Sequence, residues 1–157
     1  MYDLIGCMVE DGLPESQSKG GNKGGTIDLG AFTVTLTHAF HSSSYKGRYA
    51  GEPCGVIVKG ANGGVYHAGD TALFGDMALI REFHHPKVAI LPIGDLFTMN
   101  PVEAAYAASL LGVETAVPMH YGTFPALTGT AEQFSAECAK RGVRAHPLMP
   151  GESMSIA

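Results

Sequence analysis

The sequence changes its pattern at Asp70, and this change limits the fold more than any other feature. Before Asp70, runs of apolar and β-branched residues predict strands at 26–30, 32–37, 54–60 and 65–69. The turn sequence ANGG joins the last two strands as a hairpin. After Asp70, strand-like and helix-like segments alternate. Hairpins followed by such alternation predict one layered α/β or α+β domain.

The helices after Asp70 are marked by signals at their ends. In 100–112, Asn100 suits the N-cap, Glu103 completes a capping box, and Gly112 marks the end. Further helices are predicted at 73–85, which Pro86 stops, and at 130–142. The strands predicted between and after these helices are 87–94, 114–119, 143–149 and 152–156.

The first 25 residues have a different character from the rest. Residues 2–12 carry apolar side chains at helical spacing and end at Gly12, which predicts a helix. The polar, glycine-rich stretch 13–25 predicts a flexible connector. Its GGNKGG segment lacks the G-K-[ST] and the preceding strand of a phosphate-binding loop, and the chain contains no G-x-S-x-G nucleophile motif.

Composition excludes several classes of function. The length of 157 residues suits a single domain. The 10 Lys and Arg residues against 15 Asp and Glu, with no basic cluster, exclude nucleic acid and anionic membranes as expected partners. No apolar run reaches the roughly 18 residues of a membrane helix, and MYDLIGCMVEDG is not a signal peptide. Three cysteines without a C-x-x-C pair predict reduced thiols in a cytoplasmic protein.

Three residues that can carry chemistry follow strand-like runs: His41, Asp70 and His120. Asp70 lies beside Gly69, in HAGDT, where a carboxylate can ligate or bridge cations. The same position suits an N-cap of the following helix, and the pattern alone does not decide between the two readings.

The histidines require a choice. His120 precedes the loop YGTFPALTG and can be a metal ligand, a general base or a hydrogen-bonded structural residue. His38 and His41, three residues apart in an extended segment, point to opposite faces, and His41 is preferred because it adjoins the serines. The remaining histidines are interpreted as structural or supporting residues: His67, His84, His85 and His146.

Taken together, four stretches resemble the metallo-β-lactamase superfamily, and within it the UPF0173 metal-dependent hydrolase family. They are GGNKGGTIDLGAFTVTLTHAFHSSS, GVYHAGDTALFGDM, ILPIGDLFTMNPVEAA and VPMHYGTFPALTGT. The resemblance covers essentially the whole chain. It implies an αββα sandwich with a metal site at one edge of its two sheets. Residues 1–157 would form a single such domain, its C-terminal two thirds, incomplete at the N-terminus.

The resemblance also implies roles for individual residues. His41 would complete a first metal site, Asp70 would bridge two metals, and His120 would belong to the second site. Asp70 and His120 are therefore the expected catalytic residues. The expected metal is a divalent cation, zinc first and manganese or nickel as alternatives. Ser42 and Thr71 are expected to support the ligands, and the substrate would contact Tyr121, Thr123 and Phe124, with Leu127 completing an apolar wall.

One superfamily signature is absent. The motif H-x-H-x-D-H, which supplies most metal ligands in such proteins, does not occur in the 157 residues. The shortened sandwich is expected to expose strand edges and an apolar face. The leading hypothesis is a hydrolase whose metal-activated water attacks an ester, lactone, amide or phosphodiester of a small-molecule substrate. Its alternatives are an inactive binding or assembly module, covered in a homo-oligomer, and a mononuclear enzyme using the three remaining ligands.

Overall fold

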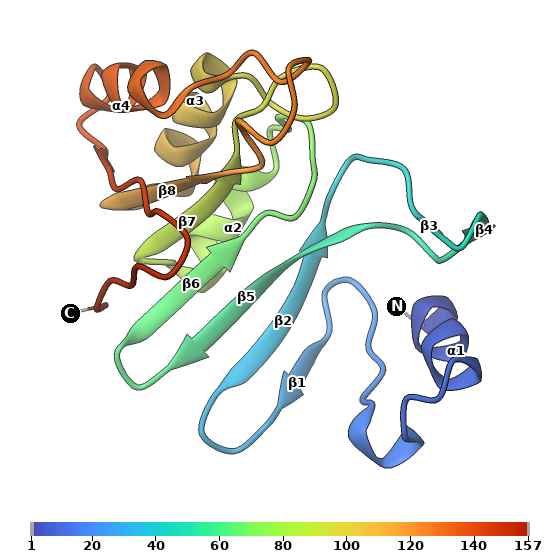
Figure 1. Cartoon of the computed structure of the whole chain (residues 1–157). Helices are drawn as coiled ribbons and strands as arrows, with labels where there is room; N and C mark the ends of the chain where they lie inside the picture. Colours follow the sequence, from blue (N-terminus) through green and yellow to red (C-terminus); the bar gives the residue numbers. More distant parts are fainter. Residues whose placement is uncertain (1, 157) are drawn as a thin grey trace.

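The computed structural model describes residues 2–156 and contains one seven-stranded mixed sheet (Figure 1). Its strands, in spatial order, are β1 (Thr26–Asp28), β2 (Thr33–His38), β5 (Cys54–Gly60), β6 (Gly63–His67), β7 (Val88–Pro92), β8 (Thr115–Met119) and β9 (Arg144–Ala145). Neighbours from β1 to β6 pair antiparallel, and neighbours from β6 to β9 pair parallel. The pairing therefore changes where the sequence pattern changes, just before Asp70.

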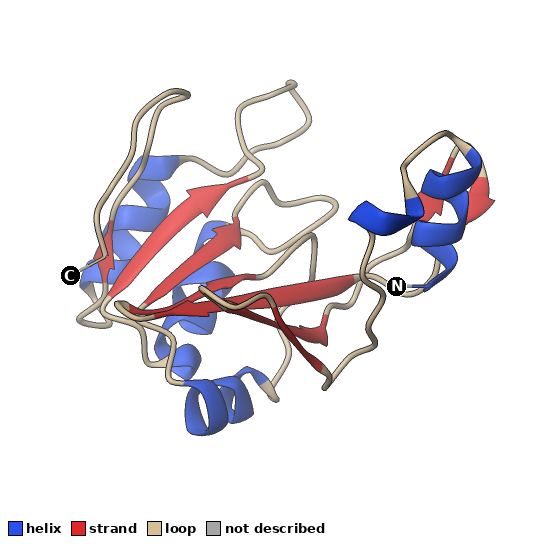
Figure 2. Ribbon diagram, turned by 90° about the horizontal axis from the view of Figure 1, so that it is seen from below, coloured by secondary structure: helices blue, strands red, loops and turns tan. Residues whose placement is uncertain are grey.

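The helices divide into two groups. The chain begins with α1 (Tyr2–Glu10) and the 3-10 turn η1 (Glu15–Gln17), and the crossovers between the parallel strands carry α2 (Met77–His84), α3 (Pro101–Leu111) and α4 (Ala131–Ala139). Figures 1 and 2 show α1 at the opposite end of the molecule from α3 and α4, beside the small ribbon of β3 (Ser44–Tyr45) and β4 (Arg48–Tyr49). No helix among residues 2–156 is long and apolar enough to cross a bilayer.

The main core lies between the sheet and the crossover helices. Alternate residues of the central strands, such as Tyr66, Leu91 and Ala116, face this core and are completely buried. Phe134 of α4 packs into the same cluster. The period of two in the strands and the small alanines of α3 allow the helices to approach the sheet closely.

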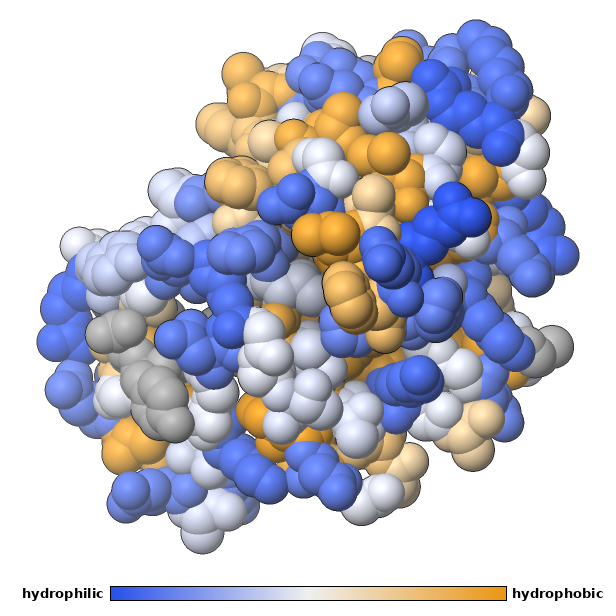
Figure 3. Space-filling model, turned by 180° about the vertical axis from the view of Figure 1, so that it is seen from behind, coloured by the Kyte–Doolittle hydropathy of each residue, from blue (hydrophilic) through white to orange (hydrophobic). Residues whose placement is uncertain are grey.

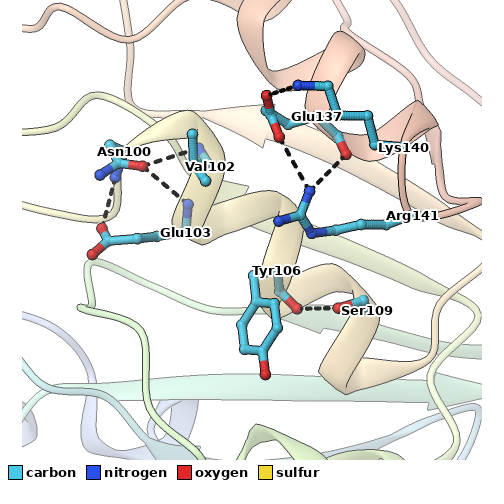
Figure 4. Close-up of polar contacts among 8 residues, drawn as sticks. All are labelled: Asn100, Val102, Glu103, Tyr106, Ser109, Glu137, Lys140 and Arg141. Carbon is cyan, nitrogen blue, oxygen red and sulfur yellow. Dashed lines mark hydrogen bonds and ion pairs between the residues drawn. The ribbon is translucent and has the colours of Figure 1, made fainter.

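The predicted start of α3 is confirmed in detail (Figure 4). The Asn100 side chain accepts hydrogen bonds from the backbone N–H groups of Val102 and Glu103, and the Glu103 carboxylate accepts one from the N–H of Asn100. Gly112 ends the helix in the left-handed conformation, with φ of 63°. Thr130 and Gln133 form the equivalent box at α4. These local signals position the helices that close the core.

Two strand predictions at the carboxyl end were wrong. Residues 152–156 form no strand, and of the segment 143–149 only Arg144–Ala145 pairs with β8. Pro147 and Pro150 explain the early end, because proline has no N–H to donate to a sheet ladder. The helix predicted at 73–85 also starts later, at Met77, because residues 71–76 form a loop.

The predicted flexible connector is instead anchored to the sheet at its second half. The N–H of Gly24 donates to the Leu36 carbonyl over 2.7 Å, and the Leu36 N–H donates to the Gly25 carbonyl over 3.1 Å. The Lys23 ammonium lies 2.6 Å from a carboxylate oxygen of Glu52. GGNKGG therefore runs as a fixed strip along β2.

The face of the sheet opposite the crossover helices remains partly open. Val34, Val56 and Val65 are half-buried there, and Val58 is exposed. They share this face because Val34 and Val65 both pair in register with Val58. The structure thus contains one large sheet of the predicted sandwich, with the expected open apolar face, and residues 2–156 form no second large sheet.

Candidate metal centre

Asp70 and His120 meet at one edge of the sheet although 49 residues separate them in the chain. Asp70 follows β6 and His120 follows β8, with β7 paired between these strands. Because the three strands are parallel, their carboxyl ends lie at the same edge. The Nε2 atom of His120 is 3.6 Å from Oδ2 of Asp70, and both side chains are partly exposed. This pair is the nucleus of the candidate site.

The alternative interpretation of Asp70 as a helix cap is excluded. Helix α2 begins at Met77, and its N-cap position is Asp76. The carboxylate of Asp70 faces His120 instead. Asp70 therefore does not cap this helix.

The backbone on both sides of the pair adopts restricted conformations. His120 has φ of 55°, in the left-handed region that non-glycine residues rarely adopt. A Cβ at Gly94 would lie 2.2 Å from the His120 carbonyl oxygen, and a Cβ at Gly69 would lie 2.8 Å from the Cys54 carbonyl oxygen. Residues held in such conformations cluster at functional sites. Gly94 and Gly69 allow the close approach that places His120 and Asp70.

His41 lies near this edge without joining the pair. Its side chain is exposed, and Nδ1 is 2.8 Å from the backbone carbonyl of Ser42. Ser42 thus contacts His41 through its backbone, and the side-chain support expected of it stays a prediction. Within residues 2–156, no three His, Cys, Asp or Glu side chains are grouped so that they could hold a metal. The three-residue ligand set therefore stays a prediction, with two members in contact.

Thr71 links the segments that carry His41 and Asp70. Its buried hydroxyl accepts a hydrogen bond from the Phe40 N–H over 2.9 Å and donates to the Ala72 carbonyl. The Ala72 N–H donates to the Phe40 carbonyl over 3.2 Å. Both hydrogen bonds of the Thr71 hydroxyl join it to backbone groups, and the support expected of its side chain for the metal ligands stays a prediction.

His67 also shapes the site, a role that its position in the sequence left open. The Gly69 N–H donates to Nδ1 of His67 over 3.1 Å, which fixes the turn immediately before Asp70. An accepting Nδ1 places the proton of the neutral ring on Nε2. The alternation within β6 puts His67 on the open face of the sheet and gave no signal for this bond.

The distance between Asp70 and His120 suits a shared cation better than a direct hydrogen bond. A hydrogen bond between them would be about 2.7–3.2 Å long. Two donors at zinc bond lengths of about 2.1 Å in tetrahedral geometry lie about 3.4 Å apart, near the 3.6 Å observed. An imidazole nitrogen and a carboxylate oxygen are also ligands that zinc, manganese and nickel accept. The two residues therefore fit part of a metal site.

The residues expected to contact substrate lie on the loop after His120. Tyr121 is half-buried against the core, whereas Thr123 and Phe124 are exposed. Leu127 is buried, and its side chain would contact a Cβ at Gly94. Sequence reasoning missed the partner loop after β7: Asp95 Oδ2 accepts a hydrogen bond from the Thr128 hydroxyl over 3.1 Å. The sequence feature that could have indicated this loop is the end of the strand in ILPIG, which Asp95 follows directly.

Comparisons with known proteins agree with this fold. A family model described as "Beta-lactamase superfamily domain" matches residues 8–121. A "UPF0173 metal-dependent hydrolase" of Rubrobacter xylanophilus is 52% identical over 161 residues, which cover 98% of this chain and 66% of that protein. A relative with the same family name from Mesorhizobium japonicum is 41% identical, and the match covers 99% of this chain and 69% of that protein.

A solved structure extends the likeness to the fold. Igni18, a novel metallo hydrolase from Ignicoccus hospitalis, superimposes with a TM-score of 0.86 at 37% identity, over 97% of this chain and 65% of that one. The sheet, its crossover helices and the edge site thus define a domain of the metallo-β-lactamase superfamily. Within it, the chain belongs to the UPF0173 family. It spans about two thirds of the length of the curated relatives it matches.

Proposed function

We propose that this chain forms part of a metal-dependent hydrolase whose site lies at the carboxyl ends of β6 and β8. The single observation that carries the proposal is the 3.6 Å approach of Asp70 Oδ2 to His120 Nε2. Relatives in the UPF0173 family are named metal-dependent hydrolases, which supports the same reaction type. The substrate would be a small molecule with an ester, lactone, amide or phosphodiester bond.

The metal at this site would be a divalent cation, with zinc the first candidate and manganese or nickel the alternatives. Such a cation lowers the pKa of bound water and polarises the bond that is attacked. Asp70 and His120 would hold it, and His41 is the third candidate ligand because Thr71 ties its loop to the loop of Asp70. Asp70 contributes a negative charge, and His120 contributes the lone pair of its Nε2 atom.

The surrounding residues would keep these donors in place. Gly94 allows the backbone of His120 to approach β7, and the bond from Gly69 to His67 fixes the turn before Asp70. Ligand atoms must be unprotonated to bind a cation.

The test is a hydrolysis assay on the chain loaded separately with zinc, manganese and nickel. The panel contains 4-nitrophenyl acetate, a γ-lactone, an anilide and bis(4-nitrophenyl) phosphate. Asp70→Asn removes one ligand charge and is expected to lower the rate by more than about 100-fold, because even indirect ligand partners contribute 10–100-fold. His146→Gln is the control, because His146 follows β9 and the contact it makes there is the hydrogen bond from its backbone N–H to the Ala116 carbonyl. Equal hydrolysis rates in the wild type, Asp70→Asn and His146→Gln, or no hydrolysis with any metal, would contradict the proposal.

A second candidate function is an assembly module without catalysis. It is favoured by the exposed Val58 on the open face of the sheet. It predicts a homo-oligomer that covers this face and that forms equally well in the presence of a chelator. Light scattering of the wild type and of Val58→Lys tests this candidate. An assembly module predicts that the wild type is an oligomer and that Val58→Lys, which places a charge on the open face, is a monomer with unchanged metal binding.

A further inference from the structure

We propose that Leu96, Phe97 and Phe124 form an apolar lip that binds an apolar acyl or aryl group of the substrate. The inference rests on the proposed hydrolase function, because it names the substrate class of the same site. The three side chains are 61%, 55% and 44% exposed, respectively. The rings of Phe97 and Phe124 lie 6.2 Å apart between centroids, with a tilt of 46°.

The lip lies at the edge of the sheet that carries the candidate metal ligands. Its first two residues follow Gly94, which packs against His120, and Phe124 belongs to the loop that His120 begins. The Gly129 N–H donates to the Gly94 carbonyl, so the two loops are joined at their base. Figure 1 shows both loops side by side at the top of the molecule, and Figure 3 shows apolar side chains at that end.

The backbone holds the lip in an exposed position. Asp95 and Leu96 have φ of 65° and 58°, in the left-handed region. The Asp95 carboxylate stabilises this turn, accepting from the Leu96 N–H over 2.8 Å and from the Thr128 hydroxyl over 3.1 Å. This conformation is uncommon for residues other than glycine. Here the result is that large apolar side chains face solvent beside the proposed ligands.

The charges on the two loops narrow the substrate class. The segments IGDLFTMN and HYGTFPALTGT contain no Lys or Arg, and Asp95 carries the only carboxylate. A phosphodiester would find no cationic side chain on these loops, and it would be repelled by Asp95. A neutral ester, lactone or amide would instead gain from covering the exposed rings. The lip therefore favours a neutral substrate with an apolar group.

The test uses a single tryptophan as a reporter, since the chain contains none. In Phe97→Trp, emission is titrated with the primary amides acetamide, butanamide, hexanamide and phenylacetamide. We expect the affinity to rise about two- to fourfold per methylene from acetamide to hexanamide, because each buried methylene contributes to transfer from water. The ranking of hexanamide against phenylacetamide distinguishes an alkyl from an aryl group, and either order supports an apolar site.

Two further variants test whether the response comes from the lip. Adding Phe124→Ser to the reporter is expected to lower the response to hexanamide at least fivefold. Phe83→Trp is the matched control, because Phe83 is 70% exposed on α2, whose carboxyl end leads to the opposite edge of the sheet. A response independent of chain length, or one equal in Phe83→Trp or unaffected by Phe124→Ser, would overturn the lip. The readout requires neither metal nor turnover, so failure of the hydrolysis assay would leave it separately measurable.

Discussion

At the scale of residues, the candidate site depends on backbone that only particular residues can supply. Asp70 is released from helix capping because α2 starts at Met77, and His120 reaches it from a left-handed position. Gly94 lies directly against the backbone of His120. The position of the His120 side chain therefore depends on Gly94 as well as on His120 itself.

Gly94→Ala is expected to displace the backbone of His120 and so disturb the candidate site. The added Cβ would lie 2.2 Å from the His120 carbonyl oxygen, so the strand end must shift. We expect a loss of about 1–3 kcal/mol in unfolding free energy and metal binding weakened at least tenfold. Gly75→Ala is the control, because its Cβ would meet no atom within 4 Å. Urea unfolding and zinc titration measure both effects, and an unchanged Gly94→Ala protein would refute the packing argument.

Tyr66 predicts how stability responds to alkaline pH. Burial raises the pKa of Tyr66 from 10.0 to about 12, and the nearby Thr37 hydroxyl offsets only part of this effect. The folded state therefore keeps the phenol proton between these values, whereas the unfolded state loses it. The stabilisation is complete below pH 10 and is lost as pH rises to 12, by about 2–3 kcal/mol.

Removing the hydroxyl isolates this effect. Tyr66→Phe keeps the buried ring and has no proton to lose, so its stability should fall less steeply between pH 10 and 12. Parallel denaturant titrations of both proteins across this range measure the difference. Identical slopes would show that the phenol of Tyr66 titrates equally in the folded and unfolded states.

At the scale of elements, the ends of helices are set by local contacts. The capping box of α3 joins Asn100 to two N–H groups over 2.9 and 3.0 Å. Asn100→Ala is expected to lower the unfolding free energy by about 1 kcal/mol, the usual effect of losing a helix cap. Thermal unfolding with a matched Asn22→Ala control would measure it. A loss no greater than that of the control would mean that α3 is held by packing alone.

The same distinction explains what the sequence could predict. The capped helices α3 and α4 were found because Asn100 and Thr130 act within one turn of chain. The strand expected at 152–156 was wrong, since pairing needs a distant partner that local β-propensity does not reveal. The residue pattern marks Asp70 and His120 at strand ends and the family resemblance places both in one metal centre, whereas their contact follows from the parallel order of β6, β7 and β8. The Thr71 and His67 hydrogen bonds left no trace in the residue pattern.

At the scale of the whole molecule, the chain combines a closed core with an open sheet face. The crossover helices bury the central part of one face, including Tyr66, Leu91 and Ala116, whereas Val58 on the other face remains exposed. The chain also spans about two thirds of the length of its curated relatives. The proposed function requires that Asp70, His120 and His41 of this chain bind a cation.

The metal content of each chain shows directly whether Asp70 and His120 hold a cation. Freshly purified and metal-loaded protein would be measured by elemental analysis, beside Asp70→Ala and the Gly75→Ala control. We expect near-stoichiometric zinc, manganese or nickel in the wild type and the control, and background values in Asp70→Ala. Background values in every protein after loading, or equal metal in Asp70→Ala, would contradict a metal centre at Asp70 and His120.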